Sequence, residues 1–424
     1  MAKRIYRAVL VKKVDVNELL AGAEGRLILG CDAAKDKWYG VWMNERSDVL
    51  RTMRWDLVDD CEDVLNLCRR LRQKGIQVEA AAEPTGTYAD AMVGKLLDAG
   101  FDVFRVSAKH AHDYQEIYDG VPSGHDAKSA AIVAKLHLER GPKSRPWQRP
   151  TSERRELRVA ADELDWIKQD EQRCLSRLES RLARHWPELA RALELTTVTA
   201  VELLAAYGGP AAVAADDEQA EKRMRRWGRG ALRADKIAHV VATAGRTVGE
   251  PMLEAERQQV QNLAVAMKEL RSKRKDAEQK LEQLTNAQPH LAPISKMVGV
   301  ATAGILTARL GDLREYGSVR ALVRAPGLNL REQSSGKKKG QLTITKRGSA
   351  VARRWLFLAA LRWLQTDAVA KAWYQAKLKR NGGVGLKAVI ALMRKLLAAL
   401  YHIAREKKYD ARKLFDCRRL QLPA

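Results

Sequence analysis

The chain has 424 residues, 46% of them hydrophobic, so it is long enough for two to four domains that each bury a core. Its 76 Lys and Arg outnumber its 52 Asp and Glu, which gives a formal net charge of +24. An excess this large, spread along the chain, excludes a disordered acidic tail and favours a nucleic acid partner over a surface that is basic only for solubility. An anionic membrane is the weaker alternative, because no long basic amphipathic segment stands apart from the globular pattern.

The cysteines and the hydrophobic runs indicate in which cellular compartment the protein is located. The five cysteines form no CxxC pair, which predicts reduced thiols rather than a zinc site. The N-terminus lacks a hydrophobic core long enough for secretion, and no run of about eighteen apolar residues occurs. We therefore expect a soluble cytoplasmic protein with no membrane partner.

The first part of the chain has an α/β pattern. After an N-terminal extension at 1–25, residues 26–55 read as a strand followed by a β-meander. Helices and strands then alternate, which predicts an α/β domain with a mixed sheet over 26–140. The run GPKSRPWQRP at 141–150 predicts a linker.

The middle region, 151–287, predicts long amphipathic helices. Leu253, Val260, Met267 and Leu281 follow a seven-residue spacing that is broken only by Arg274, which is typical of an antiparallel helix pair or of an oligomerisation coiled coil. Between the long helices lies a strongly basic stretch. It is equally consistent with a solvated helix face and with a phosphate-contacting loop, whose candidate residues are Arg225, Arg226, Trp227 and Arg229.

The last region, 288–424, predicts a mainly α domain. GVATAGILTARLGD resembles a helix-hairpin-helix element that binds phosphate through backbone N–H groups, although a tight turn in a core fits equally well. The segment APGLNLREQSSGKKKGQLTITKRGS predicts a functional loop, in which composition alone favours a plain Ser-Gly turn. The candidate phosphate contacts in and after this loop are Lys337, Lys338, Lys339, Lys346, Arg347, Arg353 and Arg354.

Acidic residues stand where predicted strands end and where a predicted helix begins. Asp32 ends the first strand, and Glu83 ends a later strand before a Pro-Thr-Gly turn. Strand ends of this kind meet at one edge of an α/β sheet, where ligands usually bind. Asp126 opens a helix, and Asp119 lies shortly before it. Together such carboxylates would hold Mg²⁺ or Mn²⁺, whereas each one alone is more often a cap or turn residue.

Six segments, taken in order, carry a resemblance to a known family. They are GCDAAK, AAEPTG, HDAKSAAIVAKL, MVGVATAGILTARLGD, YGSVRALVRAPGL and SSGKKKGQLTITKRGSAVARRWLFLAA. With them, most of the chain resembles the insertion-sequence transposases of the family numbered one hundred and ten. The resemblance implies an RNase-H-like (RuvC-like) N-terminal domain with four carboxylates, joined to a C-terminal transposase domain that carries a serine.

The resemblance also implies roles for individual residues. Asp32 and Glu83 match the first two carboxylates, and Asp126 matches the third. The family usually has two aspartates three residues apart at this helix start, but Ser123 stands three residues before Asp126. We therefore expect Asp119 to be the fourth carboxylate.

The family's serine lies in the Ser-Gly motif and is a nucleophile that becomes covalently linked to DNA. Ser335 is the first candidate for this role and Ser334 the second. The resemblance further implies bacterial DNA recombination at the nucleoid, with a structured noncoding bridge RNA that pairs with donor and target DNA. Two DNA sites must be held together, so we expect a dimer or tetramer with the long helices as its interface.

Two other functions remain open at this point. One is a metal-dependent junction nuclease that hydrolyses DNA with water and uses the serine segment only for binding. The other is a non-catalytic DNA- or RNA-binding relative, an alternative that the serine at position 123 keeps open.

Overall fold

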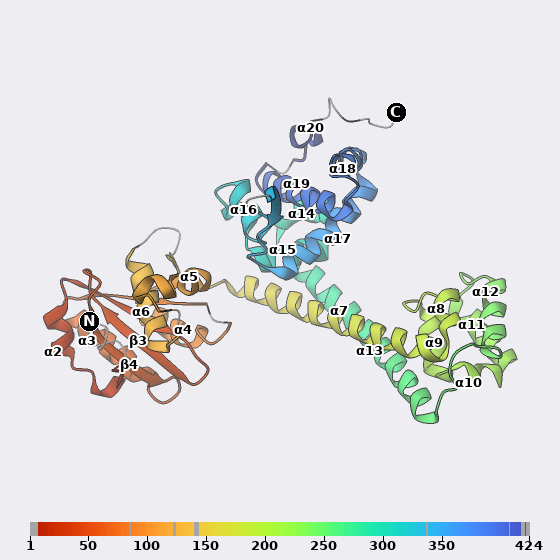
Figure 1. Cartoon of the computed structure of the whole chain (residues 1–424), viewed down its shortest axis with the longest axis horizontal. Coiled ribbons are helices and arrows are strands. Elements are labelled where there is room, and N and C mark those ends of the chain that lie inside the picture. The colour runs from red at the N-terminus through yellow and green to blue at the C-terminus, as the bar shows by residue number, and fades with distance from the viewer. Residues whose placement is uncertain are drawn as a thin grey trace. The chain divides into compact units, whose positions relative to one another are not determined.

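A computed structural model describes residues 7–84, 86–121, 124–139, 144–335, 338–406, 408–416 and 420, without the side chains of 333–335, 338, 339 and 341. The chain forms two compact units, of which the first ends at Arg149 and the second begins at Pro150 (Figure 1). Among the described residues, no single helix is long and apolar enough to cross a membrane. One pair of consecutive helices is long and apolar enough only when its two members are counted as one segment, and these two helices are bent by 117° relative to each other.

The first unit is built on a seven-stranded mixed sheet in the order β1-β4-β3-β2-β5-β6-β7. The strands are β1 (Val9–Leu10), β2 (Arg26–Asp32), β3 (Lys37–Met43), β4 (Val49–Asp56), β5 (Gln77–Ala82), β6 (Asp102–Val106) and β7 (Ser144–Pro146). The helices are α2 (Val16–Gly22), α3 (Cys61–Gln73), α4 (Asp90–Asp98), α5 (Ala108–Asp119) and α6 (Asp126–Leu138), with a 3-10 turn at Val11–Lys13. This α/β arrangement confirms the predicted meander followed by alternating helices and strands.

Helices cover both faces of this sheet, as the alternation of side chains along β2 requires. Leu27 and Leu29 pack in the cluster that contains the buried residues of α3 and α4. Ile28, which points to the opposite face, packs against the alanines of α6. Both faces of β2 are therefore dry, and its polar C-terminal residue, Asp32, lies at the sheet edge.

Two segments at the ends of this unit differ from the prediction. The segment at 1–25 supplies β1, which pairs in parallel with β4, and α2, whose Leu19 is fully buried. The segment at 141–150 supplies β7, which pairs with β6. Prolines suggested a linker there, but an edge strand tolerates proline because one side of its backbone needs no partner.

Buried polar contacts fix β7 to the far end of α6. The Nδ1 atom of His137 lies 2.7 Å from Ser144 Oγ, and its Nε2 atom lies 2.9 Å from Glu79 Oε2. His137 and Glu79 are both buried. α6 therefore begins with Asp126 at one edge of the sheet and ends near the opposite edge.

The second unit is helical apart from one β-hairpin. Its helices are α7 (Ser152–His185), α8 (Pro187–Ala192), α9 (Val198–Tyr207), α10 (Pro210–Ala214), α11 (Asp217–Gly228), α12 (Ala234–Ala244), α13 (Glu254–Asn286), α14 (Ala292–Val298), α15 (Val300–Leu310), α16 (Val319–Arg324), α17 (Ala350–Thr366), α18 (Ala368–Arg380), α19 (Gly385–Glu406) and α20 (Ala411–Leu414). Short 3-10 turns lie at Pro289–Leu291 and Leu313–Glu315. The hairpin consists of β8 (Leu330–Ser335) and β9 (Lys338–Ile344).

The long helices α7 and α13 form an antiparallel pair within the chain (Figure 1). Glu163 pairs with Lys280 at 3.6 Å and Glu171 pairs with Arg274 at 3.1 Å, so residue numbers rise on one helix as they fall on the other. Val260 and Met267 of the predicted heptads pack against α8 to α12, whereas Leu281 packs against α15. These three heptad residues are thus buried within one chain, whereas Leu253 is exposed, and the heptads do not by themselves indicate an interface between chains.

α14 and α15 form the predicted helix-hairpin-helix-like element. They meet at Gly299, whose φ of 87° is the left-handed conformation that glycine adopts without strain. The two helix axes are bent by 117° at this glycine. The buried residues of both helices pack with those of α17 and α19 in the core of the second unit.

Candidate functional site

Two predicted site carboxylates lie side by side at the C-terminal edge of the sheet. β2 and β5 pair in parallel, with Cys31 opposite Ala82. Asp32 and Glu83 come directly after this pair, and neighbouring strands lie about 4.8 Å apart. Parallel pairing therefore brings together two residues that are 51 positions apart in the sequence.

Both carboxylates belong to the face of the sheet that α6 covers. Side chains alternate along a strand, so Asp32 shares its face with Ile28, and Glu83 shares its face with Glu79 and Ala81. Ile28 and Ala81 pack against residues of α6, and Glu79 contacts His137 of the same helix. The third predicted carboxylate, Asp126, is the first residue of α6 and lies at this same edge.

A glycine sets how closely α6 approaches β2. A Cβ atom at Gly30 would lie 2.3 Å from the Ala130 carbonyl oxygen and 2.7 Å from the Ala134 nitrogen. Real side chains do not tolerate such distances to backbone atoms, so only glycine allows this approach. Gly30 and the small residues of α6 thus hold Asp126 beside the strand ends, a role that the sequence analysis did not assign to Gly30.

The start of α6 is capped by a histidine. His125 Nδ1 accepts a hydrogen bond of 3.1 Å from the Ala127 N–H, and its ring lies edge-on to Tyr39 at 6.2 Å between centroids. Tyr39 pairs with Asp32 across β2 and β3. The cap fixes the helix N-terminus, whose partial positive charge favours nearby carboxylates. The sequence pattern alone did not assign a role to His125.

The three carboxylates influence one another electrostatically. Burial, together with a smaller contribution from the charge of Asp126, raises the pKa of Asp32 to about 6. Burial raises the pKa of Glu83 to about 7, with a further contribution from Asp32. Within the described part of the chain, no lysine or arginine offsets this repulsion at either residue. The cluster therefore has an uncompensated negative charge at neutral pH.

Such a donor set fits a hard divalent cation. Carboxylate oxygens are the ligands that Mg²⁺ and Mn²⁺ prefer, and a bound cation would offset both the burial and the repulsion that raise the two pKa values. In the described residues, no three His, Cys, Asp or Glu side chains already surround one point closely enough to hold a metal. The backbone positions are in place, and the side chains would have to close around the ion.

Asp119, the expected fourth carboxylate, has a different partner. It ends α5, and its Oδ1 atom accepts a hydrogen bond of 2.6 Å from the Lys128 ammonium group. Lys128 is 1% exposed, so the two charges form a largely buried pair. Asp119 is not among the charges that raise the pKa of Asp32 or Glu83. Ser123, at the position where the family has an aspartate, lies outside the described residues.

The serine segment is the tip of the β8–β9 hairpin. The backbone of Ser334 and Ser335 ends β8, and Ser335 is in register with Lys338 of β9. Lys337 lies outside the described residues, as do the side chains of Ser334, Ser335, Lys338 and Lys339. The segment that composition assigned to a loop is thus a hairpin up to its tip.

The base of this hairpin is held by Arg353 of α17. One guanidinium nitrogen, Nη1, donates to the carbonyl oxygens of Pro326, Lys346 and Gly348 at 2.8, 3.1 and 3.0 Å. A Cβ atom at Gly348 would lie 2.0 Å from the Ala325 carbonyl oxygen, so the two chain segments are in direct contact. Arg353, predicted to contact phosphate, has three partners within the protein.

The other predicted phosphate contacts fall into two groups. Arg354 pairs with the buried Asp165 of α7, and Arg225 pairs with Glu221. Lys346, Arg347, Arg226 and Arg229 are exposed. Trp227 lies on α11 and packs against the helices around it, so the stretch left open between helix and loop is a helix up to Gly228.

Comparisons with known proteins match both parts of the chain. The family model described as transposase, of the DEDD type of IS110, matches residues 29–187. The model described as the transposase IS116/IS110/IS902 family matches residues 295–375. None of the curated proteins matches the sequence. The first match contains Asp32, Glu83 and Asp126, and the second contains the hairpin with its two serines. The chain therefore belongs to the IS110 family of transposases, DNA-binding enzymes whose N-terminal domain is RNase-H-like.

Proposed function

We propose that this transposase cuts and rejoins the strands of its own mobile element, with Mg²⁺ or Mn²⁺ held by Asp32, Glu83 and Asp126. The observation that carries the proposal is the convergence of these three carboxylates at one sheet edge without a compensating cation. DEDD-type transposase domains depend on divalent metal in general, which is consistent with this donor set. Asp119, because of its pair with Lys128, has a structural role in this proposal.

Some residues of the site would bind the metal ion, and others hold the metal-binding carboxylates in place. A bound divalent cation would stabilise the negative charge that develops on the phosphate oxygens. Asp32 and Glu83 must be ionised to bind it, so their raised pKa values make metal binding weaker as the pH falls below about 7. Gly30 and the His125 cap keep Asp126 at the strand ends.

The proposed nucleophile is Ser335, with Ser334 as the second candidate. Its hydroxyl oxygen would attack a backbone phosphorus, forming a serine–phosphate ester while the bond to one DNA oxygen breaks. The serine hydroxyl gives up its proton to water as the ester forms, and the released DNA oxygen takes up a proton from water. Attack on the ester by another strand end reverses these steps and frees the serine. One ester replaces another throughout, so no external energy source is needed.

The proposed partners are donor DNA, target DNA and a structured noncoding guide RNA. The excess of basic residues, without a sequence motif that reads bases, suits a protein that binds backbones while an RNA supplies pairing. Because two DNA sites must be held together, we propose that a dimer or tetramer is the active form.

The proposal can be tested by trapping the covalent intermediate. The purified chain would be incubated with DNA carrying the element ends, RNA transcribed from its flanking noncoding DNA, and Mg²⁺, and then denatured with detergent. We expect a protein–DNA adduct that is lost in Ser335→Ala and in Asp32→Asn, and retained in Ser176→Ala, a change of an exposed serine on α7.

The same experiment separates transesterification from hydrolysis. If Ser335→Ala and Ser334→Ala both still cleave DNA while Asp32→Asn does not, water is the nucleophile and the serine mechanism is wrong. If Ser334→Ala alone abolishes the adduct, the nucleophile is the neighbouring serine.

A further inference from the structure

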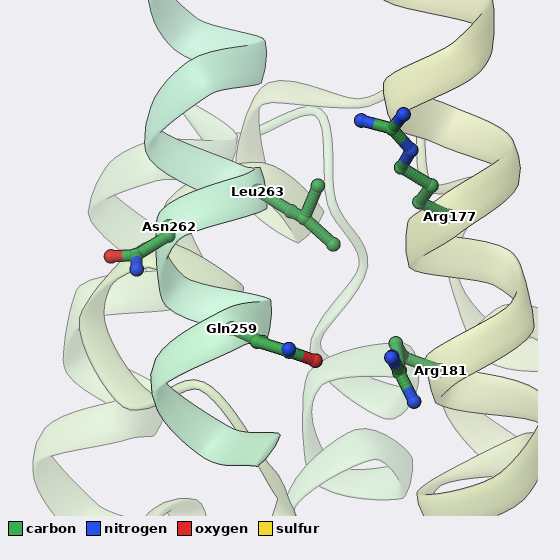
Figure 2. A pocket seen from close by; sticks show the side chains of 5 residues that line it. All are labelled: Arg177, Arg181, Gln259, Asn262 and Leu263. Carbon is green, nitrogen blue, oxygen red and sulfur yellow. The ribbon is translucent and has the colours of Figure 1, made fainter. Parts of the chain in front are cut away.

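A groove lies between the antiparallel helices α7 and α13. Arg177 and Arg181 of α7 form one wall, and Gln259 and Leu263 of α13 point toward them, whereas the Asn262 amide is directed away from α7 (Figure 2). The hollow has a volume of about 430 Å³ and is open to solvent. That volume falls within the range of roughly 300 to 1,000 Å³ found for ligand sites.

The two arginines at the groove do not take part in the ion pairs that join these two helices. Elsewhere, ion pairs join the two helices: Lys168 with Glu278, Arg274 with Glu171 and Lys280 with Glu163, at 3.0, 3.1 and 3.6 Å. In the described part of the chain, no carboxylate lies within ion-pairing distance of Arg177 or Arg181, and neither forms a hydrogen bond. The ion pairs between the helices thus leave two guanidinium groups available at the groove.

A second hollow of about 300 Å³ continues the groove and shares Arg177 and Leu263 with the first. It contains Arg173 and Lys273 on the positive side and Asp170 and Glu269 on the negative side. Arg173 is paired with Asp170 at 2.6 Å. The positive charge without a partner is therefore concentrated at the Arg177 and Arg181 end.

We propose that this groove binds the sugar–phosphate backbone of a nucleic acid strand. Arg177 and Arg181 are four residues apart on one helix face, about 6 Å along the axis, so each can contact a different phosphate of one strand. Gln259 on the opposite wall offers an amide donor and acceptor to the sugars or base edges. This site lies outside the carboxylate cluster and does not depend on the metal or serine chemistry proposed above.

The experiment compares two double variants of the full chain. Arg177→Gln with Arg181→Gln removes the groove charges, whereas Arg155→Gln with Lys275→Gln removes two exposed charges of the same helices outside the groove. Binding of dye-labelled single-stranded RNA, single-stranded DNA and duplex DNA would be measured by fluorescence anisotropy between 50 and 300 mM salt. Circular dichroism would check that all variants fold.

We expect the groove variant to lose about tenfold or more in affinity for at least one nucleic acid. Its plot of log affinity against log salt should be shallower by about 1.4 to 1.8, the value for two lost phosphate contacts. Arg177→Lys with Arg181→Lys should keep most of that slope. A loss confined to RNA identifies the guide RNA as the ligand, and a loss confined to DNA identifies the element.

Two results would overturn the proposal. One is an equal loss in the groove variant and in the Arg155 and Lys275 control, which would mean that only overall charge matters. The other is unchanged nucleic acid binding in the groove variant. If labelled polyglutamate, measured in the same way, then binds the wild type but not this variant, the groove is a site for an acidic protein segment.

Discussion

A Glu83→Gln variant is expected to be more stable than the wild-type chain at pH 8 in EDTA, and to lose most of that advantage at pH 5. Glu83 is partly buried next to Asp32, and its pKa is raised from 4.5 to about 7. Ionising it in the folded protein is therefore unfavourable, and glutamine keeps its shape without the charge. A site residue is thus predicted to destabilise the metal-free protein.

The magnitude follows from the pKa values. Raising a carboxyl pKa from 4.5 to about 7 makes the ionised folded state less favourable by about 3 kcal/mol, at about 1.4 kcal/mol for each factor of ten. Solvent reaches part of the side chain and screens it, so we expect a gain of about 1 to 3 kcal/mol in the variant. A gain of 1 kcal/mol corresponds to about 2 to 4 °C in melting temperature for a domain of this size.

The sign of the pH dependence is fixed by the direction of the shift. A raised carboxyl pKa leaves the folded wild type at its full stability below about pH 4.5, and that stability falls as the pH rises through about 7. Differential scanning calorimetry in EDTA at several pH values would measure the melting temperatures of both proteins. Asp102→Asn, an exposed carboxyl at the other edge of the sheet, is the control.

The reasoning would be refuted by a Glu83→Gln variant that melts at the wild-type temperature at pH 8. It would also be refuted by a difference that is the same at pH 5 and pH 8, because that would be a packing effect. Added Mg²⁺ should raise the wild-type melting temperature more than that of the variant, since it relieves the repulsion only where the carboxylate is present.

Three further predictions concern residues that position the two candidate sites. Gly30→Ala should destabilise the protein by about 1 to 3 kcal/mol and abolish strand cleavage, because the added Cβ would meet the Ala130 carbonyl oxygen. Thermal unfolding measures the stability and a DNA cleavage assay measures the activity. Unchanged cleavage would contradict the prediction. Asp119→Asn should lower the free energy of unfolding, measured in urea, by about 3 kcal/mol, because it leaves the Lys128 charge buried without its carboxylate partner. DNA cleavage by the folded fraction should persist. Loss of metal binding would instead show that Asp119 is a metal ligand. Arg353→Ala should cost about 1 to 3 kcal/mol and increase amide hydrogen exchange at the hairpin base, whereas unchanged exchange would show that its three hydrogen bonds do not hold the hairpin.

The α/β domain could be predicted because its signals are local. Alternating apolar residues, glycines after helices and the polar residue at each strand end all lie within short windows of sequence. The approach of Asp32 to Glu83 also followed, since parallel neighbouring strands end at the same edge. The prolines at 141–150, by contrast, are compatible both with the linker that was predicted and with the edge strand that the structure shows.

Partners that are distant in sequence could not be predicted. The pairing of Arg354 with Asp165 depends on how α7 packs against α17, which no local pattern encodes. The sequence does not distinguish the buried Lys128 from an exposed helical lysine, although its ion pair with Asp119 gives that carboxylate a structural role. The heptads of α13 predicted a helix pair, but only the fold shows that the partner helix belongs to the same chain.

Binding of Mn²⁺ to the full chain at pH 8 tests the central claim most directly. Isothermal titration calorimetry would compare the wild type with Glu83→Gln and with Asp119→Asn. If Asp32, Glu83 and Asp126 form the metal site, Glu83→Gln should weaken binding by about tenfold or more, and Asp119→Asn should leave it unchanged in the folded protein. Equal binding by the wild type and Glu83→Gln would show that the three carboxylates do not hold the metal.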